Sequence, residues 1–311
     1  MILPPKKSLS PWLLLMTGAS MLRSFATDIV WDITIGRNHL TSTGAALPGS
    51  FVFELGAFDA GFTPTAANAA DWATKWRAAS RAAYDPVTRY FSGSHNFTTN
   101  TAPFFPGAQG YMWGISGREW VLIKRSNWLW PVGNPVGGPP TTWSADGAVT
   151  AVVGSVVSPG ANFYYQTAAV SGALPPALPW SEWQKLYFTP AQLADLAVSG
   201  PDADPDGDGQ KNVMEYAAAT WPVRAASVRL PGVDLLLIPT PAGSHVALRF
   251  RSDLRAQLVV TGGRSSGLQT WDYAPAATVV VSSSAGEIVI RDADPLGAVS
   301  KRFLRLRIAP Q

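Results

Sequence analysis

The chain has 311 residues, 24 of them basic and 21 acidic, for a formal net charge of +3, and it has no cysteine. This length can bury an ordinary hydrophobic core, and the lack of cysteine excludes disulfide bridges and a cysteine-linked lipid anchor. Only 14% of the residues are charged, while glycine and proline number 28 and 26, a balance that favours an exported β-rich protein over a helical enzyme.

The first 26 residues have the pattern of a secretory signal peptide. Lys6 and Lys7 form a basic start, residues 9–22 are mostly apolar, and Ser24 and Ala26 are the small residues expected before a cleavage point. The apolar run is shorter than the roughly 18–20 residues that span a bilayer, so we expect cleavage after Ala26, with an uncleaved anchor as the alternative. We therefore expect export to the periplasm, the cell surface or the extracellular space, with no membrane span after cleavage.

The charge balance depends on this leader, which carries three basic residues and no acidic one, so that 21 residues of each sign remain after cleavage. A chain without net charge lacks the basic footprint of nucleic-acid binding, and we expect no nucleic-acid partner. Residues 27–221 carry 10 basic and 15 acidic residues, whereas residues 222–311 carry 11 and 6. The two parts can therefore attract one another.

Residues 27–180 form a tryptophan-rich region in which alternating apolar residues predict strands. One helix is expected over 68–83, because Asn68 is a capping residue and Trp72, Trp76, Ala79 and Ala83 follow it on one helical face. The strands are expected at 51–56, 110–115, 119–124, 149–157 and 162–167, with proline- and glycine-rich breaks at 133–147 and 174–179.

A helix start follows the second of these breaks. Thr189 can cap the helix, Pro190 suits its first position, and Gln192 can close a capping box. Leu193, Leu196 and Ala197 then supply an apolar face, and Gly200 ends the helix before an acidic loop begins.

The stretch from Asp204 to Glu215 has the ligand spacing of a calcium loop. Carboxylates stand at loop positions 1, 3 and 5, Gly209 at position 6 permits the sharp turn, and the glutamate at position 12 can close the site with both oxygens. Position 7 would contribute its backbone carbonyl, and position 9 would act directly or through water. The expected ligands of this structural calcium ion are Asp204, Asp206, Asp208, Gln210, Asn212 and Glu215.

Residues 204–222 combine an Asp-x-Asp-x-Asp-Gly core, the closing glutamate and a Thr-Trp-Pro end at 220–222. They resemble the bacterial thrombospondin type 3-like repeat and, more loosely, dockerin, which implies an EF-hand-like calcium site. Dockerins carry two copies and this chain carries one, so docking to a cohesin is not implied. In a paired EF-hand the entering helix runs straight into the loop, whereas Gly200 and Pro201 interrupt it here; residues 213–217 suit a short exiting helix.

Residues 223–311 show short runs of strand-forming residues separated by turns, the pattern of a small β-sandwich. In the last run Arg305 and Arg307 alternate with apolar residues, and charge on one face of a terminal strand discourages edge-to-edge pairing. Strands are expected at 233–238, 246–250, 257–261, 278–281, 287–291 and 303–308.

Four further motifs are spread over most of the mature chain: Gly-Ala-Phe-x-x-Gly-Phe-x-Pro at 56–64, Trp-Leu-Trp-Pro at 128–131, Ser-Gly-Leu-Gln-Thr-Trp at 266–271 and Arg-Phe-Leu-Arg-Leu at 302–306. Together with the order of leader, tryptophan-rich region, calcium module and β tail, they resemble exported proteins common in Verrucomicrobia-like bacteria. The motifs are structural, and the resemblance implies an exported β protein of unassigned activity.

Tryptophan rings raise the hypothesis of glycan binding, because flat aromatic rings can stack on the apolar faces of sugars. The alternative is core packing, since large aromatic side chains dominate small β cores. Alternation places Tyr111 and Trp113 on one strand face and Met112 on the other, so both readings stay open. The candidate glycan-binding residues are Trp113, Trp120, Trp128 and Trp130, with Trp143 beside them.

Glycoside hydrolysis is a further hypothesis, because it requires two carboxylates about 5–9 Å apart. Glu54, Asp59, Asp71 and Glu119 could supply such a pair, although their spacing does not demand it. The sequence has no nucleophile elbow, zinc-protease helix or phosphate loop, and its three histidines stand in unrelated contexts. We therefore predict no catalytic residue.

These patterns predict a mainly β fold with two β-sandwich-like regions, 27–180 and 223–311, joined by a short helix–calcium loop–helix module at 181–222. The expected function is that of a non-catalytic, exported structural or binding protein with a structural calcium site. Its partner would be a polysaccharide or another cell-envelope protein. A glycan-binding module of the cell envelope and, behind it, a glycoside hydrolase are the alternatives.

Overall fold

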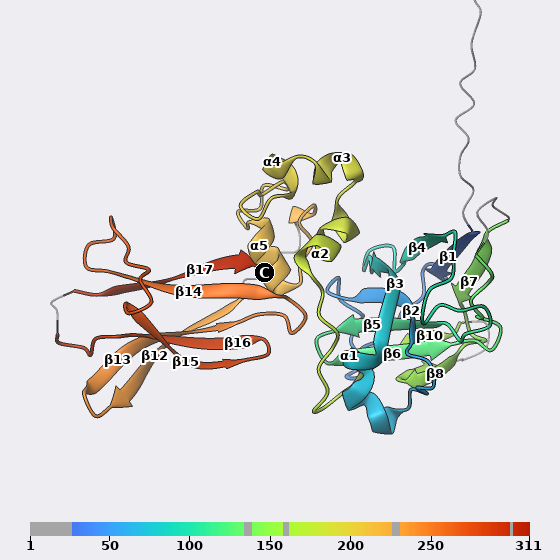
Figure 1. Ribbon diagram of the computed structural model, residues 1–311, viewed down its shortest axis with the longest axis horizontal. Helices are drawn as coiled ribbons and strands as arrows, with labels where there is room; N and C mark the ends of the chain where they lie inside the picture. The colour runs from blue at the N-terminus through green and yellow to red at the C-terminus, as the bar shows by residue number, and fades with distance from the viewer. Residues whose placement is uncertain (1–26, 134–138, 158–161, 226–230, 299–300) are drawn as a thin grey trace, which may run out of the picture.

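The computed structural model describes residues 27–133, 139–157, 162–225, 231–298 and 301–311 (Figure 1). The expected signal peptide lies outside these ranges. The protein is mainly β, as predicted, with 42% strand and 13% helix. Within the described ranges no helix is both long enough and apolar enough to cross a membrane. Two β regions lie at opposite ends of the long axis, and a group of short helices lies above their junction (Figure 1).

The N-terminal region is built on a sheet with the order β11-β6-β5-β2-β3, and β8 also pairs with β6. A second sheet has the order β4-β1-β7, in which β1 and β7 are parallel, and β9 pairs with β10. The strands are β1 (Thr27–Ile33), β2 (Val52–Phe58), β3 (Trp76–Ala83), β4 (Ser92–Phe97), β5 (Tyr111–Ser116), β6 (Glu119–Lys124), β7 (Thr141–Ala145), β8 (Thr150–Val153), β9 (Ser155–Val157), β10 (Tyr164–Gln166) and β11 (Ala168–Ala169).

Both faces of the larger sheet are covered, which is why every residue of β2 is buried. Phe53 and Leu55 belong to one hydrophobic cluster, which also includes residues of the second sheet, and Phe58 belongs to a second cluster with Trp72 and Trp113. The rings fit closely, because a Cβ on Gly110 would come within 2.3 Å of the Trp143 ring. The abundant tryptophan of this region therefore fills two packed layers.

The prediction of one helix over 68–83 is wrong. The chain forms a short 3₁₀ segment, η1 (Ala66–Asp71), and a single turn, α1 (Trp72–Lys75), and then continues as strand β3. β3 pairs with β2, with a register shift between Leu55 and Gly56. The four apolar residues match a helical period, but pairing with an already buried strand outweighs this local preference.

The other strands expected in this region are present with small shifts at their ends, but the break expected at 133–147 is wrong in part, because strand β7 lies within it. The run expected at 149–157 divides into β8 and β9 at Gly154, whose φ of +79° turns the chain in a way that favours glycine. A Cβ at this position would also meet the carbonyl oxygen of Gln166 at 2.6 Å. The prolines before residue 180 form the link to the helical group.

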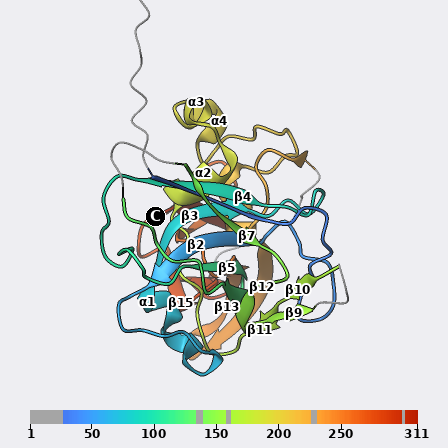
Figure 2. The same ribbon diagram turned by 90° about the vertical axis from the view of Figure 1, so that its right-hand side faces the viewer.

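The helical group consists of α2 (Trp180–Tyr187), α3 (Pro190–Leu193), α4 (Leu196–Ser199) and α5 (Asn212–Ala218). The capping box of Thr189 and Gln192 is formed as predicted. The prediction of one helix up to Gly200 with Leu193, Leu196 and Ala197 on an apolar face is wrong, because Asp195 caps a new turn and Leu196 is 74% exposed. In the end-on view of Figure 2, α3 and α4 project beyond the strands.

The C-terminal region contains all six expected strands as a sandwich of two unequal sheets. One sheet has the order β12-β13-β16-β15, and the other has only β14 and β17. The two sheets form separate layers in Figure 1. The strands are β12 (Gly232–Thr240), β13 (Gly243–Arg251), β14 (Leu258–Ser265), β15 (Thr278–Ser284), β16 (Glu287–Asp292) and β17 (Phe303–Pro310).

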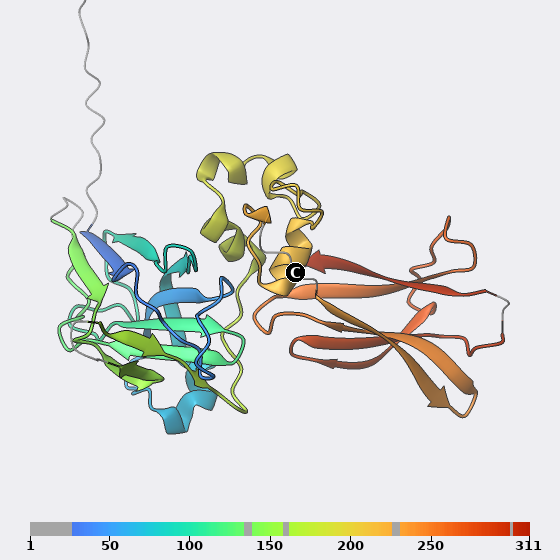
Figure 3. The same ribbon diagram turned by 180° about the vertical axis from the view of Figure 1, so that it is seen from behind.

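The junction between the regions has its own hydrophobic cluster. Val52 of β2, Trp183 of α2 and Tyr216 of α5 pack together there with Leu178. The amide of Leu178 also donates a hydrogen bond of 2.9 Å to the carbonyl of Arg255. The view from behind in Figure 3 shows the helical group over this junction. The helical group is thereby packed against strands of both ends.

Candidate metal centre

The acidic loop between α4 and α5 is folded by its own aspartates. Asp204 accepts hydrogen bonds of 3.0 Å from the amides of both Gly207 and Gly209, which have φ values of +74° and +91°. The Asp206 carboxylate accepts a hydrogen bond of 3.2 Å from the amide of Asp208. The Asp208 carboxylate accepts one of 2.8 Å from the amide of Gln210. These bonds turn the loop tightly and bring its carboxylates to one side.

The three aspartates form a cluster that could hold a metal ion, because one carboxylate oxygen of each lies within 4.8 Å of those of the other two. One oxygen of Asp206 and one of Asp208 accept the hydrogen bonds that fold the loop, and the other oxygen of each is buried without a hydrogen-bond partner among the described residues. These unpartnered oxygens are what a hard cation would require as ligands.

Glu215, in the first turn of α5, is the expected closing ligand. It is 0% exposed, and neither carboxylate oxygen has a hydrogen-bond partner among the described residues. Burial raises the pKa of Glu215 to about 8, and the charges of Asp206, Asp208 and Asp204 contribute to the rise. The Thr220 hydroxyl acts in the opposite direction and lowers this pKa.

The metal-free arrangement is therefore costly, since a buried carboxylate without a partner loses its hydration and gains nothing in return. Glu215 lies outside the group of oxygens within 4.8 Å, yet its pKa responds to all three aspartates. Lys211 does not neutralise them, because it pairs with Asp202 at 2.7 Å on the surface.

The remaining two expected ligands are also buried beside the loop. Asn212 is 0% exposed, and its side-chain amide donates to the carbonyls of Val198 and Gly200 at 2.9 and 2.8 Å, while its side-chain oxygen has no partner. Gln210 is 4% exposed, and both polar atoms of its side chain lack partners within the described ranges. The structure thus places all six expected ligands in one loop and the adjoining helical turn.

The candidate glycan-binding residues lie in the core. Trp113 and Trp120 are 0% exposed, Trp130 is 1% and Trp128 is 2%, and Trp143 beside them is 1% exposed. Trp113, for example, contacts Trp72, Trp76 and Trp120 edge to face. No sugar ring can reach these faces while the core is packed, so they do not form a stacking platform.

The candidate carboxylates for hydrolysis do not converge. Glu54 pairs with Trp113 of β5, which pairs with Leu122 of β6, so these three side chains lie on one face of the sheet. Glu119 is three residues before Leu122 on β6, and because side chains alternate along a strand it lies on the opposite face. Asp59 pairs with Arg77 at 3.0 Å, and Asp71 is exposed at the end of η1. These four residues offer no acid–base pair.

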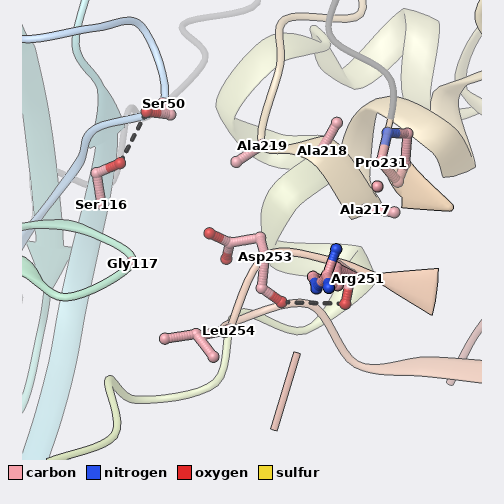
Figure 4. Close-up of a pocket in the computed structure, with 12 residues that line it drawn as sticks. Ser50, Ser116, Gly117, Ala217, Ala218, Ala219, Pro231, Arg251, Asp253 and Leu254 are labelled. Atoms are coloured by element: carbon pink, nitrogen blue, oxygen red, sulfur yellow. Dashed lines mark hydrogen bonds between the residues drawn. The ribbon is translucent and has the colours of Figure 1, made fainter. Parts of the chain in front are cut away.

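A cavity of about 400 Å³ at the junction has no counterpart in the sequence patterns (Figure 4). Its walls come from the N-terminal region at Ser50 and Ser116, whose hydroxyls are 2.7 Å apart, and from the C-terminal region at 251–254. A third wall is the end of α5 at 217–219, less than two turns beyond Glu215. Ordering of α5 by a metal ion would therefore also order one wall of this cavity.

No family model, curated protein or solved structure matches this chain. The resemblance to thrombospondin type 3-like repeats and to exported verrucomicrobial proteins therefore rests on the quoted motifs alone.

Proposed function

We propose that the protein is a non-catalytic, exported structural or binding protein in which a calcium ion orders the helical junction between two β regions. The observation that carries this proposal is the fully buried Glu215, whose two oxygens have no hydrogen-bond partner in the part of the chain that the structure describes, beside three clustered aspartates. A proton can neutralise Glu215 alone, whereas a divalent cation can be bound by all four carboxylates and offsets two of their four negative charges. A ligand set made only of oxygen atoms favours a hard cation such as calcium.

The contacts of α5 support a structural role for the ion. Tyr216, the residue after Glu215, donates from its hydroxyl to the carbonyl of Leu178 at 2.5 Å and accepts from the amide of Gln257 at 2.8 Å. Just after α5, the indole of Trp221 donates to the carbonyl of Gly49 at 2.8 Å. α5 and the residues after it therefore bond to both ends of the molecule.

Metal binding at the start of α5 would stabilise this network by mass action. A site with a dissociation constant of ~10 μM under ~1 mM calcium adds about 2.7 kcal/mol to the stability of the folded state. Without the ion, repulsion among the carboxylates acts on the first turn of α5 and, through Tyr216, on the contacts with both β regions. The partner of the ordered protein would be a polysaccharide or another protein of the cell envelope.

The test is a thermal melt of residues 27–311 in calcium and in chelator. We expect a higher melting temperature in calcium, and we expect Asp206→Ala to lower the melting temperature in calcium but not in chelator. Asp202→Ala is the matched control, because it removes the same charge from an 84% exposed side chain next to the loop. An equal loss from Asp206→Ala in both conditions, or no effect of calcium on the unmodified protein, would overturn the proposal.

A further inference from the structure

The C-terminal sandwich leaves a row of apolar side chains uncovered on its inner face. Val233, Leu235 and Leu237 of β12 are 52%, 72% and 64% exposed. Their partners on β13 include Phe250, which is 1% exposed. We call Val233, Leu235 and Leu237 the β12 row. Paired residues of antiparallel strands share a face, so the β12 row belongs to the face of the sheet that forms the core.

The row is exposed because the second sheet is too narrow. β17 lies against β13, and β14 lies against β15 and β16. A Cβ on Gly262 of β14 would meet Ile290 of β16 at 2.6 Å, which confirms that β14 covers that strand. The two strands therefore cover the middle of the four-stranded sheet. The position over β12, beside β17, has no strand among the described residues.

The edge of β17 that borders this position pairs with no strand in the part of the chain that the structure describes, and α5 also lies against β17. Among the described residues β17 pairs with β14 alone, along residues 303–310. The opposite edge of β14 is partly used, since Arg264 and Asp272 exchange backbone hydrogen bonds of 3.0 and 2.9 Å. An extended segment could therefore add to β17 through backbone hydrogen bonds and place alternate side chains on the β12 row.

The charge beside this edge specifies the other side chains of such a segment. Arg305 and Arg307 are exposed on the outer face of β17. Arg305 is held in place by the Tyr273 hydroxyl and lies over the Trp271 ring at 4.3 Å. Arg307 forms no ion pair with another described residue. Outward side chains of an added strand would lie directly beside both arginines, where acidic groups are favoured.

We propose that the β17 edge and the β12 row accept one extended segment of a partner protein, with apolar side chains at every second position and acidic side chains between them. The apolar residues would complete the sandwich core, and the acidic residues would pair with Arg305 and Arg307. A second copy is disfavoured, because antiparallel pairing of two β17 strands would bring the arginines of both copies together.

The test uses two fluorescent nine-residue peptides with blocked ends, one alternating isoleucine with glutamate and the other alternating isoleucine with lysine. We expect the glutamate peptide to bind the protein at least tenfold more tightly than the lysine peptide. Arg307→Glu should reverse this preference, and Leu235→Asp should weaken binding of the glutamate peptide at least tenfold. Both substitutions are at exposed positions, and circular dichroism checks that the fold is kept.

Val280→Asp is the matched control for Leu235→Asp. Val280 is also apolar, is 55% exposed and pairs with Ile290, so it lies on the same inner face but on the opposite edge strand. We expect it to leave peptide binding unchanged. The proposal is overturned if neither peptide binds, if both bind equally, or if Val280→Asp weakens binding as much as Leu235→Asp. Concentration-dependent dimers that Leu235→Asp dissolves would identify a second copy as the occupant instead.

Discussion

Glu54 and Arg255 are 201 positions apart in the chain and form an ion pair that is closed off from solvent. Glu54 is 0% exposed on β2, and Arg255 is 3% exposed before β14. Arg81 donates a second hydrogen bond to the carboxylate at 2.8 Å, and the Trp76 indole donates a third at 2.6 Å. Burial alone would raise the pKa of Glu54, but the charges of Arg255 and Arg81, with the hydrogen bonds from Arg81 and Trp76, hold it below its ordinary value.

This ion pair leads to the first prediction. Glu54→Gln removes the negative charge and leaves Arg255 buried without its counter-ion, so we expect a loss of about 3–5 kcal/mol in the free energy of unfolding. The measurement is unfolding in denaturant, followed by tryptophan fluorescence. Asp59→Asn is the control, because it breaks a pair whose side chains are 47% and 33% exposed and should cost less than about 1 kcal/mol. Similar losses in both variants would contradict a special role for the buried pair.

The second prediction concerns Glu215, for which the same substitution should have opposite effects in two conditions. In chelator, Glu215 must take up a proton to become neutral beside the three aspartates, whereas glutamine is neutral already, so the Glu215→Gln variant should be more stable than the unmodified protein by about 1–3 kcal/mol. In calcium, the variant lacks a ligand and should be the less stable of the two. Melts in both conditions measure the change of sign.

Glu287→Gln is the control for this change of sign. Glu287 is a partly exposed glutamate in the C-terminal sandwich, paired with Arg251 at 3.0 Å. Its substitution should have the same small effect in calcium and in chelator. A Glu215→Gln variant that is destabilised equally in both conditions would mean that the glutamate has a packing role and no role in metal binding.

The sequence predicted those features whose residues are neighbours in the chain. The expected calcium ligands recur within twelve positions, and the strands of the C-terminal region alternate with a period of two, so the candidate metal site and these strands could both be recognised locally. Trp72 and Trp76 fit a helix by spacing, but only pairing with β2 decides that Trp76 begins a strand. The contact of Glu54 with Arg255 has no local signal at all.

Burial of the tryptophans could not be predicted for a related reason. Alternation assigns Trp113 and Met112 to opposite faces of a strand, and it cannot tell whether a second layer covers each face. In the structure both faces are covered, and both residues are 0% exposed. Helix α2 did have a local signal, since Trp180, Trp183 and Tyr187 recur at helical spacing, but it is short and follows directly on a proline-rich break.

The third prediction concerns the hydroxyl of Tyr216. Tyr216→Phe leaves the carbonyl of Leu178 and the amide of Gln257 without their partner, so we expect a loss of about 1–3 kcal/mol in the free energy of unfolding. Tyr90→Phe is the control, because the Tyr90 hydroxyl forms no hydrogen bond to a described residue. Denaturant unfolding compares the two variants. Equal stability of both would mean that the Tyr216 hydroxyl does not couple α5 to the residues on either side of it.

The last prediction concerns the response to acid. His39 is 1% exposed, and its Nδ1 accepts a hydrogen bond of 3.0 Å from the amide of Tyr165, on whose ring it stacks. Burial lowers the pKa of His39 to about 4 from 6.5, and the charge of Arg37 adds to this. The unfolded chain therefore takes up the proton first as the pH falls.

The contribution of His39 to stability is accordingly complete above about pH 6.5 and is lost as the pH falls toward 4, up to a total of about 3 kcal/mol. His39→Asn keeps an acceptor for the Tyr165 amide but has no proton to bind. Unfolding measured between pH 7 and 4 should show a steeper loss for the unmodified protein than for this variant. Burial also lowers the pKa of His95, but His95 is present in both proteins, so the difference isolates His39. Parallel pH curves would exclude His39 as the source of acid sensitivity.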